Sequence, residues 1–82
     1  MITVILYGAP DCRRYQKMRQ LVVSEAARLN LPIQINEFGE TEQLVQFNPI
    51  SLPRLYINGQ LVASQNPPSV KQIAKFLEQE KS

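Results

Sequence analysis

The residue best suited to chemistry in this sequence is Cys12, the only cysteine, which lies within APDCRRYQKM at positions 9–18. A thiolate is a good nucleophile and exchanges readily with disulfides. The sequence has no histidine, which excludes the usual Cys-His and Ser-His catalytic pairs and argues against a zinc site. A lone cysteine cannot form an intramolecular disulfide, which fits a reducing compartment. The chemistry open to this chain is that of a single thiol.

The residues around Cys12 predict that this thiol is reactive. A helical pattern begins at Cys12, and the first turn of a helix presents unpaired N–H groups that favour a thiolate. Arg13 and Arg14 add positive charge, whereas the carboxylate of Asp11, the expected N-cap, opposes it. The alternative is a cysteine that serves as a small buried hydrophobe. Because a helix start that follows a loop is typically exposed in part, we favour a reactive Cys12.

The length and composition indicate one globular domain over residues 1–82. Hydrophobic residues make up 44% of the 82 residues and charged residues 20%, which is typical of folded soluble proteins. The initial apolar run, MITVILYG, is too short for a membrane span or for the apolar region of a signal peptide. We therefore expect a cytoplasmic protein that has no membrane partner.

The basic residues are concentrated in the segment that follows Cys12, although the net charge is only +2. This segment contains Arg13, Arg14, Lys17, Arg19 and Arg28, against a single acidic residue, Glu25. We interpret these cations as a solvated helix face. The alternative is a cationic surface that attracts an acidic partner or an anionic small molecule. Nucleic-acid binding is not expected, because sequence-independent binding normally needs a larger basic footprint.

The first half of the chain has the pattern of a βαβ unit, which would position Cys12. An apolar run at residues 2–8 predicts a buried strand that ends in a tight loop. Apolar residues then recur at helical spacing: Tyr15, Met18, Leu21, Val22, Ala26 and Leu29. Residues 32–38 alternate, with Ile33, Ile35 and Glu37 on one side, which predicts a second strand parallel to the first.

The second half predicts a short helix, a hairpin and a final helix. The segment ETEQLVQF, residues 40–47, suggests a short helix whose apolar contacts are Leu44, Val45 and Phe47. In LYINGQLVA, Asn58-Gly59 is the preferred composition for a two-residue type I′ turn. Ser69 and Gln72 have the spacing of a capping box at the start of a helix over about residues 69–80. The predicted order βαβαββα implies a mixed four-stranded sheet with helices on both faces.

Four segments give the chain a specific resemblance to a known family. They are the first strand running into GAPDC, the helix that opens at Cys12, the segment SLPRLYINGQLV, and PPSVKQI at the start of the last helix. Together they resemble a minimal thioredoxin fold, and most closely the small thioredoxin- and glutaredoxin-like proteins of the redox-active disulfide type. The similarity spans nearly the whole chain.

This resemblance implies roles for individual residues. The family's Cys-x-x-Cys motif corresponds to Cys12-Arg13-Arg14-Tyr15, so the nucleophile is present and Tyr15 replaces the resolving cysteine. Pro53 matches the family's cis proline, and the backbone of Leu52 would pair with an extended substrate. On the same resemblance, the partner-binding surface would comprise Asp11, Arg13, Arg14, Leu52 and Arg54.

Tyr15 limits what this thiol can do, because a phenol cannot attack a mixed disulfide. Its ring packs into the core or its hydroxyl donates a hydrogen bond to the thiolate of Cys12, and packing is favoured. Two functions stay open: monothiol thiol-disulfide exchange through Cys12 with glutathione or a protein thiol, and a catalytically silent thioredoxin-fold module that binds a protein. The residues Cys-Arg-Arg-Tyr and SQNPPS differ from the Cys-Gly-Phe-Ser motif and Gly-Gly turn of cluster-binding glutaredoxins, so no cofactor is expected.

Overall fold

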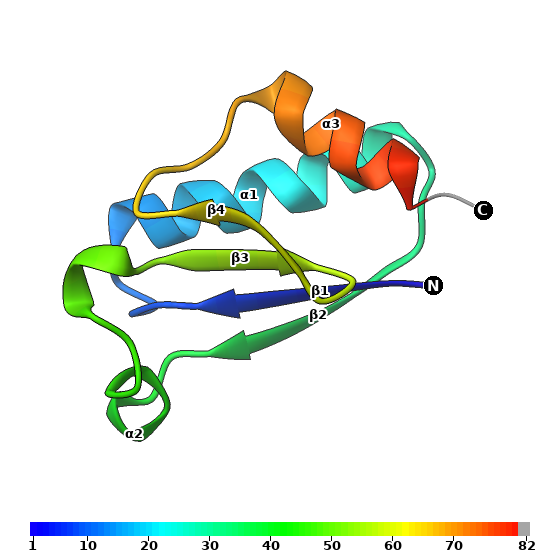
Figure 1. The fold of residues 1–82 in the computed structure, drawn as a ribbon. Helices are drawn as coiled ribbons and strands as arrows, with labels where there is room; N and C mark the ends of the chain where they lie inside the picture. The colour runs from blue at the N-terminus through cyan, green and yellow to red at the C-terminus, as the bar shows by residue number, and fades with distance from the viewer. Residues whose placement is uncertain (81–82) are drawn as a thin grey trace.

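The centre of the fold is a four-stranded sheet with strand order β2-β1-β3-β4, seen in a computed structural model that describes residues 1–80 (Figure 1). The strands are β1 (Ile2–Tyr7), β2 (Ile33–Phe38), β3 (Arg54–Ile57) and β4 (Gln60–Ser64). β1 is parallel to β2 and antiparallel to β3, and β3 is antiparallel to β4. The predicted α/β fold, with element order βαβαββα and a mixed sheet, is confirmed.

The β3–β4 hairpin has the turn that its sequence predicts. Asn58 and Gly59 connect the two strands, and both have positive φ angles, 48° and 82°, as a type I′ turn requires. Glycine adopts such angles without a steric penalty, and asparagine tolerates them better than most residues. The hairpin places β3 against β1, with Leu6 opposite Leu55 and Val4 opposite Ile57.

Helices α1 (Arg13–Arg28) and α3 (Val70–Gln79) cover one face of the sheet and pack against each other (Figure 1). Ser69 caps α3 and forms a capping box with Gln72, as predicted. The core lies between these helices and the inward-facing side chains of the strands. Its buried hydrophobic residues are Ile2, Val4, Leu6, Tyr15, Met18, Val22, Ala26, Leu55, Ile57, Ile73 and Leu77. No helix in the described part of the chain, residues 1–80, is long and apolar enough to cross a membrane.

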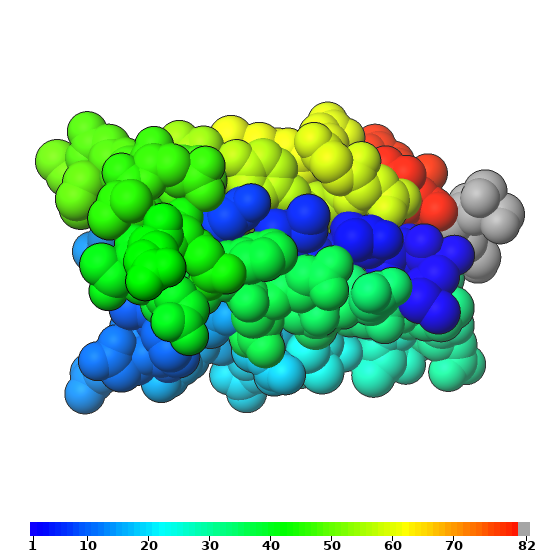
Figure 2. All heavy atoms as spheres, turned by 90° about the horizontal axis from the view of Figure 1, so that it is seen from below, coloured from blue at the N-terminus to red at the C-terminus, as the bar shows by residue number. Residues whose placement is uncertain are grey.

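The opposite face of the sheet is covered only at one end, by α2 (Thr41–Leu44) and the 3₁₀ turn η1 (Pro49–Ser51). Figure 2, which views this face, shows the strands exposed beyond that green segment. The Tyr7 ring anchors the segment, since its centroid lies 4.7 Å from that of Phe47. The prediction that Val45 makes apolar contacts is wrong, because α2 ends at Leu44 and Val45 is 73% exposed. Successive residues of a helical turn point in different directions, so Leu44 and Val45 cannot both face the sheet.

Candidate functional site

Cys12 is the N-cap of α1, at the carboxyl end of β1. Its N–H donates to the carbonyl of Ala9 at 3.0 Å, which closes a turn with Pro10 and Asp11 at the central positions. Its own carbonyl accepts the N–H of Gln16 at 3.0 Å and begins the helix. The prediction that Asp11 is the N-cap is therefore wrong. Asp11 is exposed in the turn, and no side chain caps α1.

The Cys12 residue is half-buried and contacts the edge of the hydrophobic core. The first helical N–H groups after it have no acceptor within the helix, and these groups form the positive end of the helix dipole. The first turn of α1 contains no acidic residue. A negative charge on Cys12 Sγ would therefore lie beside unpaired backbone donors.

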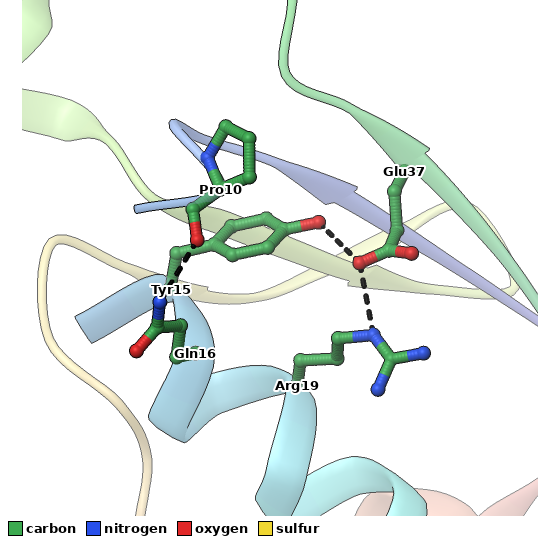
Figure 3. Close-up of polar contacts among 5 residues, drawn as sticks. All are labelled: Pro10, Tyr15, Gln16, Arg19 and Glu37. Atoms are coloured by element: carbon green, nitrogen blue, oxygen red, sulfur yellow. Dashed lines mark hydrogen bonds and ion pairs between the residues drawn. The ribbon is translucent and has the colours of Figure 1, made fainter. Parts of the chain in front are cut away.

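Tyr15, one turn along α1, is a core residue with only 4% of its surface exposed. Figure 3 shows its hydroxyl pointing toward Glu37 on β2, to whose Oε1 it donates a hydrogen bond of 2.5 Å. The Arg19 Nε donates to the same carboxylate oxygen at 2.9 Å. Burial, reinforced by the adjacent Glu37 carboxylate, raises the pKa of Tyr15 well above its usual range. The phenol's one donor is thus used by Glu37, which leaves packing as the role of the ring.

Gly8 connects Tyr15 with Pro53 at this end of the sheet. A β-carbon at Gly8 would lie 2.7 Å from Tyr15 Cδ2 and 3.0 Å from Pro53 Cβ, so a side chain here would displace one of them. Pro53 is buried, and the Leu52–Pro53 peptide bond is cis. The Leu52 N–H donates to the Pro49 carbonyl at 3.3 Å. The close packing around Gly8 therefore brings Leu52 and Pro53 to the end of the sheet at which Cys12 starts α1.

Two of the residues assigned to the partner surface border a basic pocket beside Cys12. Arg13 and Arg14, with Lys17, form one wall, and the other wall is the segment Asn66–Pro68 that leads into α3. The pocket has a volume of about 340 Å³. The prediction of a solvated cationic face holds for these exposed side chains, whereas Arg19 and Arg28 on the same helix form ion pairs with Glu37 and Glu25.

Leu52 also borders an apolar groove of about 390 Å³, which the sequence did not indicate. The other lining residues are Thr41, Leu44, Val45, Phe47 and Pro49. The groove depends on the path of the chain between β2 and β3, which no local pattern specifies.

Arg54 lies apart from Cys12, on the sheet face opposite α1. Its guanidinium carbon is 4.7 Å from the centroid of the Phe47 ring, and its Nη1 donates to the Tyr56 hydroxyl at 3.0 Å. Its Nε is buried and has no hydrogen-bond partner among residues 1–80. Arg54 therefore packs against Phe47, which lines the apolar groove, and is not itself a lining residue of that groove.

Sequence reasoning missed the partners that hold Tyr15: Glu37, Arg19 and Gly8. One signal was present, because Glu37 alternates with Ile33 and Ile35 on the side of β2 that faces the helices. Its side chain is 39% exposed, and its carboxylate accepts hydrogen bonds from the Tyr15 hydroxyl and the Arg19 guanidinium. Within residues 1–80, no group of three His, Cys, Asp or Glu side chains is arranged to hold a metal ion.

Comparison with known proteins identifies a family and finds solved structures of similar fold. A family model described as a thioredoxin domain matches residues 1–78. The arsenical resistance operon trans-acting repressor from Bacteroides vulgatus is 13% identical over 100% of this chain and 97% of that chain, with a TM-score of 0.59. Glutaredoxin 1 from Francisella tularensis, complexed with cacodylate, is 12% identical over 96% and 95%, with a TM-score of 0.52. No curated protein matches the chain. At these identities, the two structures establish similarity of fold.

Proposed function

This chain belongs to the thioredoxin domain family, and we propose that it carries out monothiol thiol-disulfide exchange through Cys12 in the cytoplasm. The partner is glutathione or a protein thiol. The likeness of its fold to a glutaredoxin supports this class of reaction. A chain with one cysteine suits a reducing compartment, in which external thiols are abundant.

The placement of Cys12 carries this proposal. The thiol belongs to the N-cap of a 16-residue helix, at the end of the sheet where Gly8 packs against Pro53. The residue is partly accessible, and the backbone N–H groups in the first turn of α1 have no acceptor within the helix. A merely structural cysteine needs none of these features.

The reaction proceeds in two exchanges. The Cys12 thiolate attacks one sulfur of a disulfide, the new S–S bond forms to Cys12, and the other sulfur leaves as a thiolate that takes a proton from water. Tyr15 has no sulfur with which to resolve this mixed disulfide. A second external thiolate, such as that of glutathione, must attack it, which regenerates Cys12 and leaves the external sulfurs joined as a disulfide. Cys12 ends in its initial oxidation state, so the external thiols supply all the electrons.

A silent protein-binding module is the second candidate, and the environment of Tyr15 favours it. The position that would hold a resolving cysteine contains a buried ring with its own hydrogen-bond partners. Such a replacement stabilises the helix start whether or not Cys12 reacts. In this case the apolar groove and the basic pocket would bind a partner without sulfur chemistry.

The two candidates differ in the rate at which Cys12 reacts with glutathione disulfide. The folded protein and the same protein unfolded in guanidinium are incubated at neutral pH, and mass spectrometry follows the mixed disulfide. We expect the folded protein to react at least as fast as the unfolded chain, and Cys12→Ser to form no adduct. If the unfolded chain forms the adduct and the folded protein does not, the exchange activity is contradicted and the silent binding module is the remaining candidate.

A further inference from the structure

We propose that the partner that reacts with Cys12 is an extended protein segment, with an acidic side chain on one side of its reacting cysteine and a large apolar side chain on the other. This inference rests on the proposed exchange activity and names the class of its substrate. The acidic side chain would occupy the basic pocket of Arg13, Arg14 and Lys17, and the apolar one the groove beside Leu52.

The cations of the basic pocket lie at the N-terminal end of α1, where the helix dipole disfavours positive charge. A helix N-terminus favours Asp and Glu in its first turn, because the helix dipole is positive there, yet α1 begins with Arg13 and Arg14. No ion pair within residues 1–80 engages Arg13, Arg14 or Lys17. The cations further along α1 have carboxylate partners, as Arg19 has Glu37 and Arg28 has Glu25. Residues that oppose local stability in this way are typical of a binding site, and this cluster of exposed cations would attract an anionic ligand group.

The groove on the other side is apolar and has exposed hydrophobic side chains at its rim. Val45 lines the groove and is 73% exposed, and Ile50, which follows the lining residue Pro49, is 70% exposed. None of the residues of α2 is buried, so this segment adds little to the stability of the core. A partner side chain such as leucine would remove apolar surface from water on both molecules.

Both features lie at one end of the molecule. Figure 1 places the start of α1, the connection between β4 and α3, and the η1 segment at the same end of the sheet. Arg13 follows Cys12 directly, and Leu52 precedes the Pro53 that packs against Gly8. A chain that reaches both pockets must span more than one residue. Glutathione has carboxylates but no large apolar side chain, so it can satisfy the basic pocket and not the groove.

The chemical step is the one already given. Cys12 Sγ forms a bond to the sulfur of the partner's cysteine, the partner's S–S bond breaks, and the released sulfur leaves as a thiolate. The two pockets change only the concentration and orientation of the peptide at Cys12.

The test measures exchange of Cys12 with short peptides whose single cysteine carries a thiopyridyl disulfide, which releases an absorbing product. The peptides place Glu or Lys on one side of the cysteine and Leu or Ser on the other, in both sequence orders. Each rate is divided by the rate of the same peptide with 2-mercaptoethanol, which removes differences in intrinsic reactivity. We expect Glu over Lys, and Leu over Ser, each to raise the normalised rate about fivefold.

Variants assign each preference to its pocket. Arg14→Glu should remove the preference for Glu, and Val45→Ser should remove the preference for Leu. Lys75→Glu, an exposed cation on α3, and Val23→Ser, 39% exposed on α1, are the matched controls and should keep both preferences. Equal normalised rates for all peptides, with Cys12 still reactive, would overturn the substrate class and leave the exchange activity intact. No reaction with any peptide or with glutathione disulfide would overturn both.

Discussion

The two ends of the first turn of α1 have opposite environments, although Cys12 and Tyr15 are only three positions apart in the sequence. Cys12 is half-buried beside unpaired backbone donors, with no side-chain cap on the helix. Tyr15 is in the core, and its hydroxyl is hydrogen-bonded to Glu37, which Arg19 also holds. One end presents a partly accessible thiol, and the other is part of the packing.

This difference shows how one helical turn can hold both a partly accessible thiol and a fully packed aromatic ring. A large aromatic side chain that enters the core needs space and a partner for its polar group. Gly8 provides the space, since any β-carbon there would meet the Tyr15 ring, and Glu37 provides the partner. The buried Tyr15 side chain is therefore held by residues from β2 and from the loop after β1.

The largest expected effect is on formation of the mixed disulfide, which should require Cys12 and not the hydroxyl of Tyr15. Cys12→Ser should abolish the mixed disulfide with glutathione, because no other sulfur nucleophile of this kind is present. Tyr15→Phe should keep the rate of its formation within about twofold, since the phenol contributes no step. Mass spectrometry of both variants after exposure to glutathione disulfide measures this. A Tyr15→Phe protein that is folded but does not react would make the hydroxyl part of the chemistry.

The second effect concerns the stability of the fold, to which Tyr15 should contribute more than Cys12. Tyr15→Ala should lower the free energy of unfolding by about 3–5 kcal/mol, as the loss of a buried aromatic ring does. Cys12→Ala should lower it by about 1 kcal/mol or less, because this residue is half-buried and its side chain caps nothing. Guanidinium unfolding followed by circular dichroism compares the two. Equal losses would mean that Cys12 is as structural as Tyr15.

A smaller effect isolates the hydroxyl of Tyr15 from its ring. Tyr15→Phe should cost about 1–2 kcal/mol, because it removes a hydrogen bond to a charged group while Arg19 still holds Glu37. Tyr7→Phe is the matched control and should cost much less, since no side-chain hydrogen bond within residues 1–80 uses the Tyr7 hydroxyl. If both substitutions change the unfolding midpoint equally, the Tyr15–Glu37 bond does not stabilise the fold.

The smallest effect is a dependence on alkaline pH. The unfolded chain loses the Tyr15 proton at the ordinary pKa of about 10, whereas the folded protein holds it to higher pH. The stabilisation is therefore complete below pH 10 and declines above it. Between pH 10 and 11, the free energy of unfolding should fall by about 1 kcal/mol more in the wild type than in Tyr15→Phe. Parallel pH profiles for the two proteins would contradict the raised pKa of Tyr15.

Most of the fold followed from local patterns in the sequence. The Asn58-Gly59 turn, the capping box at Ser69 and the helical spacing from Tyr15 onward each depend on a few neighbouring residues. The position of Cys12 at the helix start was predicted for the same reason. Asp11 was misassigned because aspartate is favoured both at the N-cap of a helix and in a turn that contains proline. Here Asp11 is a central residue of the turn that the Cys12 N–H closes on the Ala9 carbonyl.

The Tyr15–Glu37 hydrogen bond and the apolar groove join residues that are far apart in the sequence or lie on an irregular segment, so sequence patterns could not predict them. Tyr15 and Glu37 are 22 residues apart and meet only because β2 lies parallel to β1 under α1. The apolar groove depends on the irregular path from Thr41 to Leu52, where α2 is only four residues long. Arg54 was assigned to the partner-binding surface together with Leu52, but strand alternation turns it to the face of the sheet opposite α1.

The most direct test of the central claim is the stoichiometry of one reaction in the wild type and in Tyr15→Cys. Each folded protein receives less than one equivalent of dithiobis(nitrobenzoate), whose released thiolate absorbs visible light. The wild type should release one thiolate per molecule of reagent and stop at a stable mixed disulfide on Cys12. Tyr15→Cys should release two, because the introduced sulfur resolves the intermediate and closes a disulfide between positions 12 and 15.

Tyr15→Ser, which removes the ring without adding a sulfur, is the control and should release one thiolate. A folded Tyr15→Cys protein that also stops at one would contradict the placement of these two residues. A wild type that releases none would contradict the reactivity of Cys12.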